Sequence, residues 1–139
     1  MVSHVAIIGA GVSGLTAGYA LRKIGIKVDL YEKSESVIEF GAGITLSKNA
    51  TSLLEGLGLM NVIAEQGYRP MGSYIRDFKN AKIVSSMEFD ENFITIDRRV
   101  LVEQLSNKFL EMEGNIYFGR DIQSLNSSTG QVKISDHSL

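Results

Sequence analysis

The first part of the chain alternates apolar runs with glycines in an order that predicts strand, helix and strand. His4–Ile8 is a short apolar run that ends at Gly9, and we expect a strand buried on both faces. Ser13–Ile24 has apolar residues at helical spacing, and Gly25 stands where a helix would end. The apolar positions of this helix are Leu15, Ala17, Tyr19, Ala20, Leu21 and Ile24. Lys27–Tyr31 predicts a second strand, so the whole segment reads as a βαβ unit.

The rest of the chain predicts shorter elements around one further long helix. That helix is Arg98–Met112, because its apolar residues recur at spacings of three to four. The other expected elements are an extended segment over Ile44–Ser47, short helices over Asn49–Gly56 and Met60–Gln66, antiparallel strands over Ser73–Phe78, Lys82–Phe89 and Phe93–Ile96, a parallel strand over Asn115–Phe118, and a hairpin of Asp121–Leu125 with Val132–Ile134. This order predicts an α/β fold, with a Rossmann-like parallel sheet plus antiparallel strands, in a single domain over residues 1–139.

The turn after the first strand carries the clearest chemical signal. It reads Gly9-Ala10-Gly11-Val12-Ser13-Gly14, in which Gly9 permits a tight turn and Gly11 lets a pyrophosphate approach the backbone. Gly14 allows the helix to pack close to the sheet, and the helix N-terminus offers unpaired N–H groups to phosphates. Glu32 ends the second strand, where its carboxylate would accept hydrogen bonds from ribose hydroxyls and disfavour a 2′-phosphate. The pattern predicts a dinucleotide, NAD or FAD, against the alternative of an ordinary glycine-rich turn.

Composition narrows the possible functions. The chain is 44% hydrophobic and 22% charged with a net charge of −2, which gives no electrostatic case for binding nucleic acid or an anionic membrane. It has no cysteine and two histidines, so disulfides and a histidine or cysteine metal centre are not expected. No apolar run reaches the length of a membrane span, and no signal peptide is evident, so we expect a cytoplasmic protein.

Three stretches resemble a known family. Gly9–Glu32 (GAGVSGLTAGYALRKIGIKVDLYE) is similar to its FAD fingerprint, Gly41–Leu59 (GAGITLSKNATSLLEGLGL) to its GAGI-x-L-x-P-N-A segment and following helix, and Ile96–Leu105 (IDRRVLVEQL) to its I-x-R-x-x-L-x-x-x-L helix start. On these residues the chain resembles the N-terminal, FAD-binding part of the FAD-dependent monooxygenases of the para-hydroxybenzoate hydroxylase and salicylate hydroxylase type.

The resemblance implies a set of FAD contacts. These are Gly9, Gly11, Ser13 and Gly14 at the pyrophosphate, Glu32 at the ribose, Ala42 and Gly43 along the flavin half, Arg98 at the phosphates or ribityl chain, and the backbone of Ile122 near the adenine. A guanidinium suits the Arg98 role because it offers several donors to a phosphate. From the residues alone, Asp97-Arg98-Arg99 could equally be a solvated, self-paired cluster.

The resemblance also implies an activity: NAD(P)H reduces FAD, and a peroxyflavin hydroxylates an aromatic or similar small molecule. No side chain is assigned as a catalytic acid or base. Lys48 stands where the family often has proline, and the sequence contains neither an Asp-Gly nor a Gly-Asp dipeptide, both of which the family uses. We therefore expect a C-terminally truncated version of the fold, with a strand missing from the sheet and residues of about 70–97 on the substrate side. A non-catalytic FAD- or NAD-binding module or remnant, an NAD-linked dehydrogenase domain, and a homodimer formed at an open sheet edge stay as alternatives.

Overall fold

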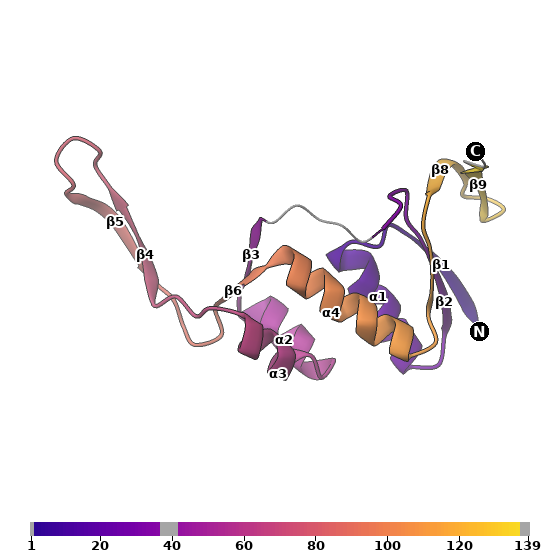
Figure 1. Cartoon of the computed structure of the whole chain (residues 1–139), viewed down its shortest axis with the longest axis horizontal. Helices are drawn as coiled ribbons and strands as arrows, with labels where there is room; N and C mark the ends of the chain where they lie inside the picture. The colour runs from indigo at the N-terminus through magenta and orange to yellow at the C-terminus, as the bar shows by residue number, and fades with distance from the viewer. Residues whose placement is uncertain (1, 37–41, 137–139) are drawn as a thin grey trace. The chain divides into compact units, whose positions relative to one another are not determined.

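The computed structural model describes residues 2–36 and 42–136 of the chain (Figure 1). These residues fall into two compact units. Unit 1 combines Met1–Phe40 with Leu101–Leu139, and unit 2 is Gly41–Val100.

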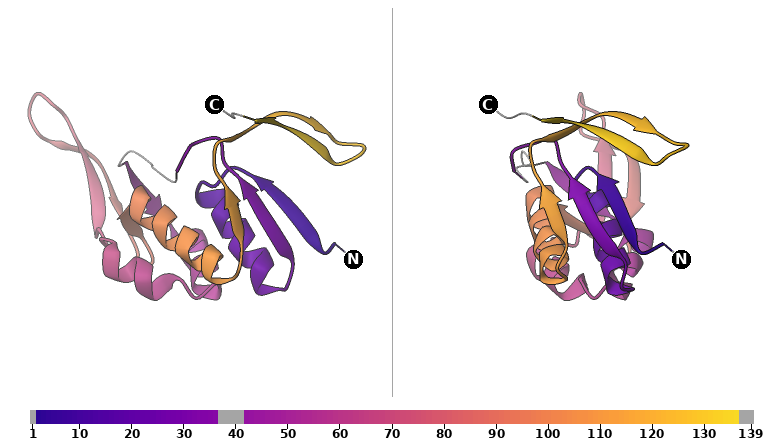
Figure 2. Two further views of the ribbon diagram at one scale, coloured as in Figure 1. Left: turned by 45° about the vertical axis from the view of Figure 1, so that its right-hand side comes forward. Right: turned by 90° about the vertical axis from the view of Figure 1, so that its right-hand side faces the viewer.

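Unit 1 is built on a three-stranded parallel sheet in the order β1-β2-β7 (Figure 2). The strands are β1 (His4–Ile8), β2 (Lys27–Tyr31) and β7 (Asn115–Tyr117). Helix α1 (Val12–Lys23) connects β1 to β2, and α4 (Arg98–Glu111) precedes β7. Since β1 and β2 are parallel neighbours joined by α1, the predicted βαβ unit is confirmed.

The core of unit 1 lies between the sheet and its helices. Leu15 of α1, Leu30 of β2 and Phe109 of α4 are fully buried. Gly18 lets α1 approach α4 closely, because a Cβ placed on Gly18 would lie 3.0 Å from Cε2 of Phe109. Ile24 was expected on the apolar face of α1 but is 73% exposed, since it lies past the last helical turn.

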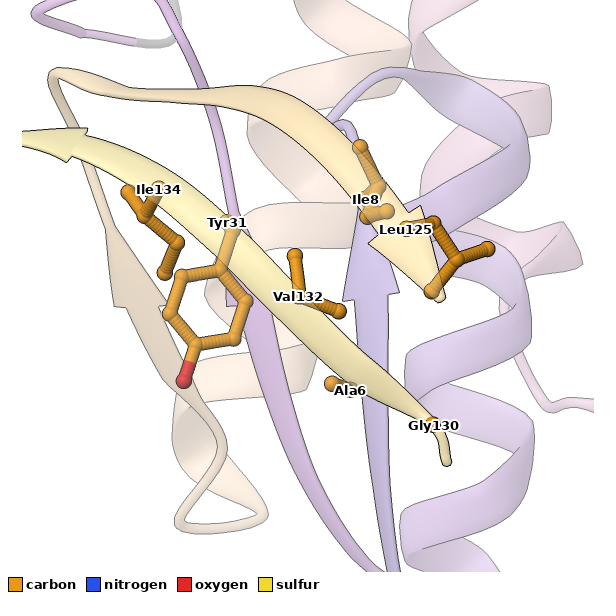
Figure 3. Close-up of a pocket in the computed structure, with 7 residues that line it drawn as sticks. All are labelled: Ala6, Ile8, Tyr31, Leu125, Gly130, Val132 and Ile134. Carbon is orange, nitrogen blue, oxygen red and sulfur yellow. The ribbon is translucent and has the colours of Figure 1, made fainter. Parts of the chain in front are cut away.

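On the opposite face of the sheet, β1 is not buried as the sequence predicts. Ala6 and Ile8 point to this face and are exposed, so the prediction of a strand buried on both faces is wrong for the described residues. The reason is non-local: the helices cover only one face. A hairpin of β8 (Arg120–Asn126) and β9 (Gln131–Asp136) faces the other. Its apolar side chains and those of the strands line a cavity of about 440 Å³ (Figure 3).

Unit 2 contains a small packed layer. Strand β3 (Gly43–Leu46) pairs antiparallel with β6 (Ile94–Asp97), and the helices α2 (Lys48–Gly56) and α3 (Met60–Gln66) follow β3. The buried apolar residues of this unit are Leu46, Leu54, Leu59, Ile63, Ile94 and Ile96. The expected segments are confirmed.

A second antiparallel pair of unit 2 projects away from α2 and α3 (Figures 1 and 2). It consists of β4 (Gly72–Arg76) and β5 (Ile83–Glu88), with a register shift at Ile75/Arg76. All residues of β5 are exposed. The predicted hairpin therefore forms, but it contributes little to the core.

Candidate dinucleotide site

The turn that leaves β1 has the geometry expected of a dinucleotide loop. Gly9 has a φ of +95°, a left-handed conformation that side chains rarely adopt, and its N–H donates to the carbonyl of Tyr31 at 2.8 Å. Gly11 is the N-cap of α1, and its carbonyl accepts the first helical hydrogen bond from Leu15 at 3.0 Å. Apart from Gly11 and its two neighbours in the chain, no atom lies within 4 Å of where a Cβ on Gly11 would be, so the backbone is open to a ligand.

The start of α1 carries no capping side chain. Gly11 makes no side-chain cap hydrogen bond, and Ser13 lies exposed in the first turn. The N–H groups of a helix start and the positive end of its dipole favour an anion. The loop and helix start together therefore provide an open backbone cradle suited to a phosphate.

Glu32 follows β2, and its side chain is hydrogen-bonded to this loop. Its Oε2 accepts a hydrogen bond from the Ala10 N–H at 2.8 Å, and its Oε1 accepts one from the Ser34 N–H at 3.0 Å. Partial burial acts to raise the pKa of the Glu32 carboxyl. Hydrogen bonds from the Ser34 N–H, the Ala10 N–H and the Ser34 hydroxyl, with the nearby Lys33 charge, outweigh burial and lower that pKa. Glu32 is thus held as a carboxylate, the form that accepts hydrogen bonds from hydroxyls.

A cavity of about 270 Å³ lies beside this carboxylate. Gly9, Glu32 and Ile122, which come from three separate stretches of unit 1, line it together. Its other lining residues are Ile8, Tyr31, Lys33, Arg120 and Asp121. The sequence analysis assigned Gly9, Glu32 and Ile122 of this lining to the dinucleotide but did not assign the charged side chains of Lys33, Arg120 and Asp121. The sequence signal that could have identified these charged residues is their position close to the two assigned residues, Glu32 and Ile122.

The remaining predicted contacts lie in unit 2. The Arg98 N–H donates to the Ala42 carbonyl at 3.1 Å, and Gly43 pairs in register with Asp97, so the structure brings these residues together. Ala42, Gly43 and Arg98 are exposed. Gly41, the first residue of the same motif, lies outside the described residues.

Asp97 and Arg99 bear out part of the alternative interpretation of this cluster. The Arg99 Nη2 donates to Oδ2 of Asp97 at 2.7 Å, and the Arg99 N–H donates to Oδ1 at 2.9 Å. Hydrogen bonds from the Arg99 side chain and backbone lower the pKa of the Asp97 carboxyl. Asp97 and Arg99 therefore pair with each other at the start of α4.

Residues 2–36 and 42–136 contain neither a cluster suited to a metal ion nor a helix suited to crossing a membrane. No group of three or more His, Asp or Glu side chains in this range is placed to hold a metal ion. No helix within it is both long and apolar enough to cross a membrane.

The described residues fit the ADP half of a dinucleotide. The backbone at Gly11 is open, the start of α1 has no side-chain cap, and the Glu32 carboxylate borders a cavity next to the loop. Fold and site together define a dinucleotide-binding βαβ protein. More specifically, the chain belongs to the FAD binding domain family, which it matches over residues 2–135.

Curated relatives are similar over parts of the chain. The 3-amino-4-hydroxybenzoate 2-monooxygenase of Streptomyces cremeus is 42% identical over 66 residues, which are 48% of this chain and 17% of that protein. The Aurachin C monooxygenase/isomerase of Stigmatella aurantiaca is 34% identical over 107 residues, 73% of this chain and 28% of that protein. The chain thus spans less than a third of the length of these relatives.

Solved structures share the fold. That of 2-methyl-3-hydroxypyridine-5-carboxylic acid oxygenase, mutant Y270A, superimposes with a TM-score of 0.82 and 28% identity, covering 98% of this chain and 38% of that one. The p-nitrophenol 4-monooxygenase of Pseudomonas putida DLL-E4 has a TM-score of 0.81 at 14% identity, covering 95% and 36%. The second similarity concerns the fold alone.

Proposed function

We propose that the chain binds FAD as the FAD-binding part of a flavin-dependent monooxygenase, and that unit 1 holds the ADP half. The assigned contacts in unit 1 are Gly9, Gly11, Ser13 and Gly14 at the pyrophosphate, Glu32 at the ribose, and the backbone of Ile122 at the adenine. The family match supports FAD over NAD as the ligand of this loop.

One observation carries this proposal. The Glu32 carboxylate accepts the Ala10 N–H of the glycine loop at 2.8 Å and also lines the cavity that contains Gly9 and Ile122. An acid in this place meets the hydroxyls of a ribose when the pyrophosphate lies on the loop. The lowered pKa of Glu32 keeps the carboxylate charged for that role at neutral pH.

In unit 2, Ala42, Gly43 and Arg98 are the proposed contacts on the flavin side. The exposure of all three residues and the hydrogen bond from the Arg98 N–H to the Ala42 carbonyl support this assignment. The Arg98 guanidinium would donate to a phosphate or to the ribityl hydroxyls. The single family match across residues 2–135 supports the proposal that both units belong to one FAD-binding domain.

For the whole protein we propose NAD(P)H-dependent hydroxylation of an aromatic small molecule. Bound FAD supplies the redox chemistry, and the described residues bind and orient it. The names of relatives support an aromatic substrate, among them the 3-hydroxybenzoate 6-hydroxylase of Klebsiella oxytoca, which is 34% identical over 66% of this chain and 23% of that protein. The proposal includes a homo-oligomer, such as a dimer, because the tetrameric form of 2-methyl-3-hydroxypyridine-5-carboxylic acid oxygenase shares this fold.

The test is a titration of the purified, folded chain with FAD, in which binding is monitored by the change in flavin fluorescence. The expected result is saturable binding that Glu32→Ala weakens by roughly tenfold or more, since the substitution removes the charged acceptor for the ribose. Circular dichroism of both proteins shows whether each is folded.

Glu65→Ala is the matched control, because it removes an exposed carboxylate from α3 in unit 2. It is expected to leave FAD binding unchanged. A folded wild-type chain that binds no FAD, or a Glu32→Ala variant with unchanged affinity, contradicts the proposal.

A further inference from the structure

The corner between β7 and β8 consists of Phe118 and Gly119, and its backbone requires a glycine. Gly119 has a φ of +64°, a left-handed conformation that is strained for a residue with a Cβ. Crowding is not the reason for a glycine here. The three atoms nearest to a Cβ on Gly119 would be those of the Glu35 carboxyl, at 3.2–3.5 Å, and Glu35 is an exposed, flexible side chain. The direction of the turn itself is therefore what selects glycine.

This corner holds the end of β2 through three backbone hydrogen bonds. On the β7 side, the Tyr117 carbonyl accepts a hydrogen bond from the Glu32 N–H at 2.9 Å. On the β8 side, the Arg120 N–H donates to the Glu32 carbonyl at 2.8 Å, and the Gly119 N–H donates to the Ser34 carbonyl at 3.1 Å. Both backbone polar groups of Glu32 are thus bonded to the two sides of one turn.

The same corner also sets where β8 begins. Ile122 of β8 lines the cavity of about 270 Å³ together with Glu32 and Gly9. The Glu32 carboxylate reaches this cavity while its Oε2 accepts the Ala10 N–H of the glycine loop at 2.8 Å. A change in the turn at Gly119 would therefore move the backbone that carries Glu32 relative to the cavity.

We propose that Gly119 is a positioning residue for the nucleotide site: its left-handed turn fixes the backbone of Glu32 so that the carboxylate faces the cavity where a ribose binds. This inference rests on the proposed FAD-binding function, because it assigns the ligand of Glu32. It adds a residue that lies outside the glycine motif and that acts through Glu32 without touching the ligand.

The first experiment compares Gly119→Ala with Gly130→Ala by fluorescence titration with FAD. Gly130 is the matched control, because its φ of +68° imposes the same backbone strain on alanine and it lies outside the lining of the nucleotide cavity. Both variants are expected to lose similar stability in urea denaturation. Alanine at position 119 relaxes the turn in the free chain, and FAD binding must restore it, so only Gly119→Ala should bind FAD more weakly, by roughly three- to tenfold.

Gly119→Asn gives the same comparison at a smaller backbone cost, since asparagine adopts the left-handed region more readily than alanine. Its affinity for FAD is expected to lie between those of the wild-type chain and Gly119→Ala. Wild-type affinity in a folded Gly119→Ala chain, or an equal loss of affinity in Gly130→Ala, overturns the inference.

A double-mutant cycle with Glu32→Ala distinguishes positioning from general damage to the fold. If Gly119 acts through Glu32, then Gly119→Ala should weaken FAD binding much less in the Glu32→Ala background than in the wild-type background. A merely structural role predicts the same fold-change in both backgrounds. Additive effects of the two substitutions on FAD affinity therefore overturn the inference.

A measurement without nucleotide separates this inference from the proposed function. The Ala10 N–H donates to the Glu32 carboxylate, so its amide resonance in a nitrogen-15 NMR spectrum reports the position of that carboxylate. The Ala10 resonance is expected to shift in Gly119→Ala and to stay in place in Gly130→Ala. An unmoved Ala10 resonance in Gly119→Ala overturns the inference. A wild-type chain that binds no FAD defeats the proposed function, whereas the Ala10 resonance still tests whether Gly119 positions Glu32.

Discussion

Gly14 lies so close to the carbonyl oxygen of Gly9 that a Cβ on Gly14 would stand 1.9 Å from that oxygen. The same Cβ would lie 3.3 Å from Cγ2 of Ile7. Both neighbours belong to the β1 strand and its turn, and a backbone carbonyl cannot rotate away as a flexible side chain can. The close approach of α1 to the loop therefore depends on the absence of a side chain at Gly14.

Gly14→Ala is expected to destabilise the fold despite the higher helix propensity of alanine. Alanine is favoured over glycine by about 1 kcal/mol inside a helix, but forced overpacking costs about 1–3 kcal/mol or more. We expect a net loss of about 2 kcal/mol in the free energy of unfolding, measured by urea denaturation. A Gly14→Ala chain as stable as wild type would show that α1 and the loop pack differently.

Gly11→Ala separates binding from stability. No neighbouring atom lies within 4 Å of its Cβ position, and φ is −77°, so the free energy of unfolding should change by less than about 0.5 kcal/mol. The added methyl group would occupy the space that we assign to the pyrophosphate. FAD affinity, measured by fluorescence titration, is expected to fall roughly tenfold or more. Unaltered affinity in Gly11→Ala would place the phosphates elsewhere.

Phe109→Ala tests the helix side of unit 1. The Phe109 ring is fully buried and lies against Gly18 of α1, so its removal leaves a cavity. We expect a loss of about 3–5 kcal/mol in the free energy of unfolding. Leu110→Ala is the matched control, because Leu110 is 49% exposed and should cost far less. Similar losses in the two variants would contradict this assignment of the core.

The hydrogen bonds between Asp97 and Arg99 are expected to make the stability of the fold depend on pH. Hydrogen bonds from the Arg99 side chain and backbone hold the pKa of the Asp97 carboxyl below the ordinary value of about 3.9. Its contribution is thus present above that ordinary pKa and is lost as the pH falls through the lowered folded value. Asp97→Asn should lower the thermal midpoint at neutral pH and weaken its decline in acid. Parallel curves for wild type and variant would contradict the role of the pair.

Local features of unit 1 could be predicted from sequence. The bounds of β1 and β2, the position of α1 and the turn at Gly9 follow from apolar spacing and glycine placement within a short stretch. The exposure of Ile8 could not be predicted, because it depends on what covers the second face of the sheet. A run of apolar residues is the same whether one face or both are covered.

In the candidate site, too, residues within a local motif could be predicted and residues brought in by the fold could not. Glu32 was identified because its distance from the glycine motif is a recognisable pattern. Ser34 and Arg120 were not, since a loop serine and an arginine after a short strand match no motif. Only the folded chain brings the β7–β8 corner to the end of β2, where the Gly119 N–H meets the Ser34 carbonyl.

The central claim is that unit 1 binds the ADP half of FAD, and a competition titration tests it most directly. The chain is loaded with FAD and titrated at neutral pH with ADP, FMN or NADP. The account predicts that ADP displaces FAD, that FMN, which lacks the adenosine half, displaces it far less, and that NADP is disfavoured by the Glu32 carboxylate. Displacement by FMN as effective as that by ADP, or no displacement by ADP, would contradict the account.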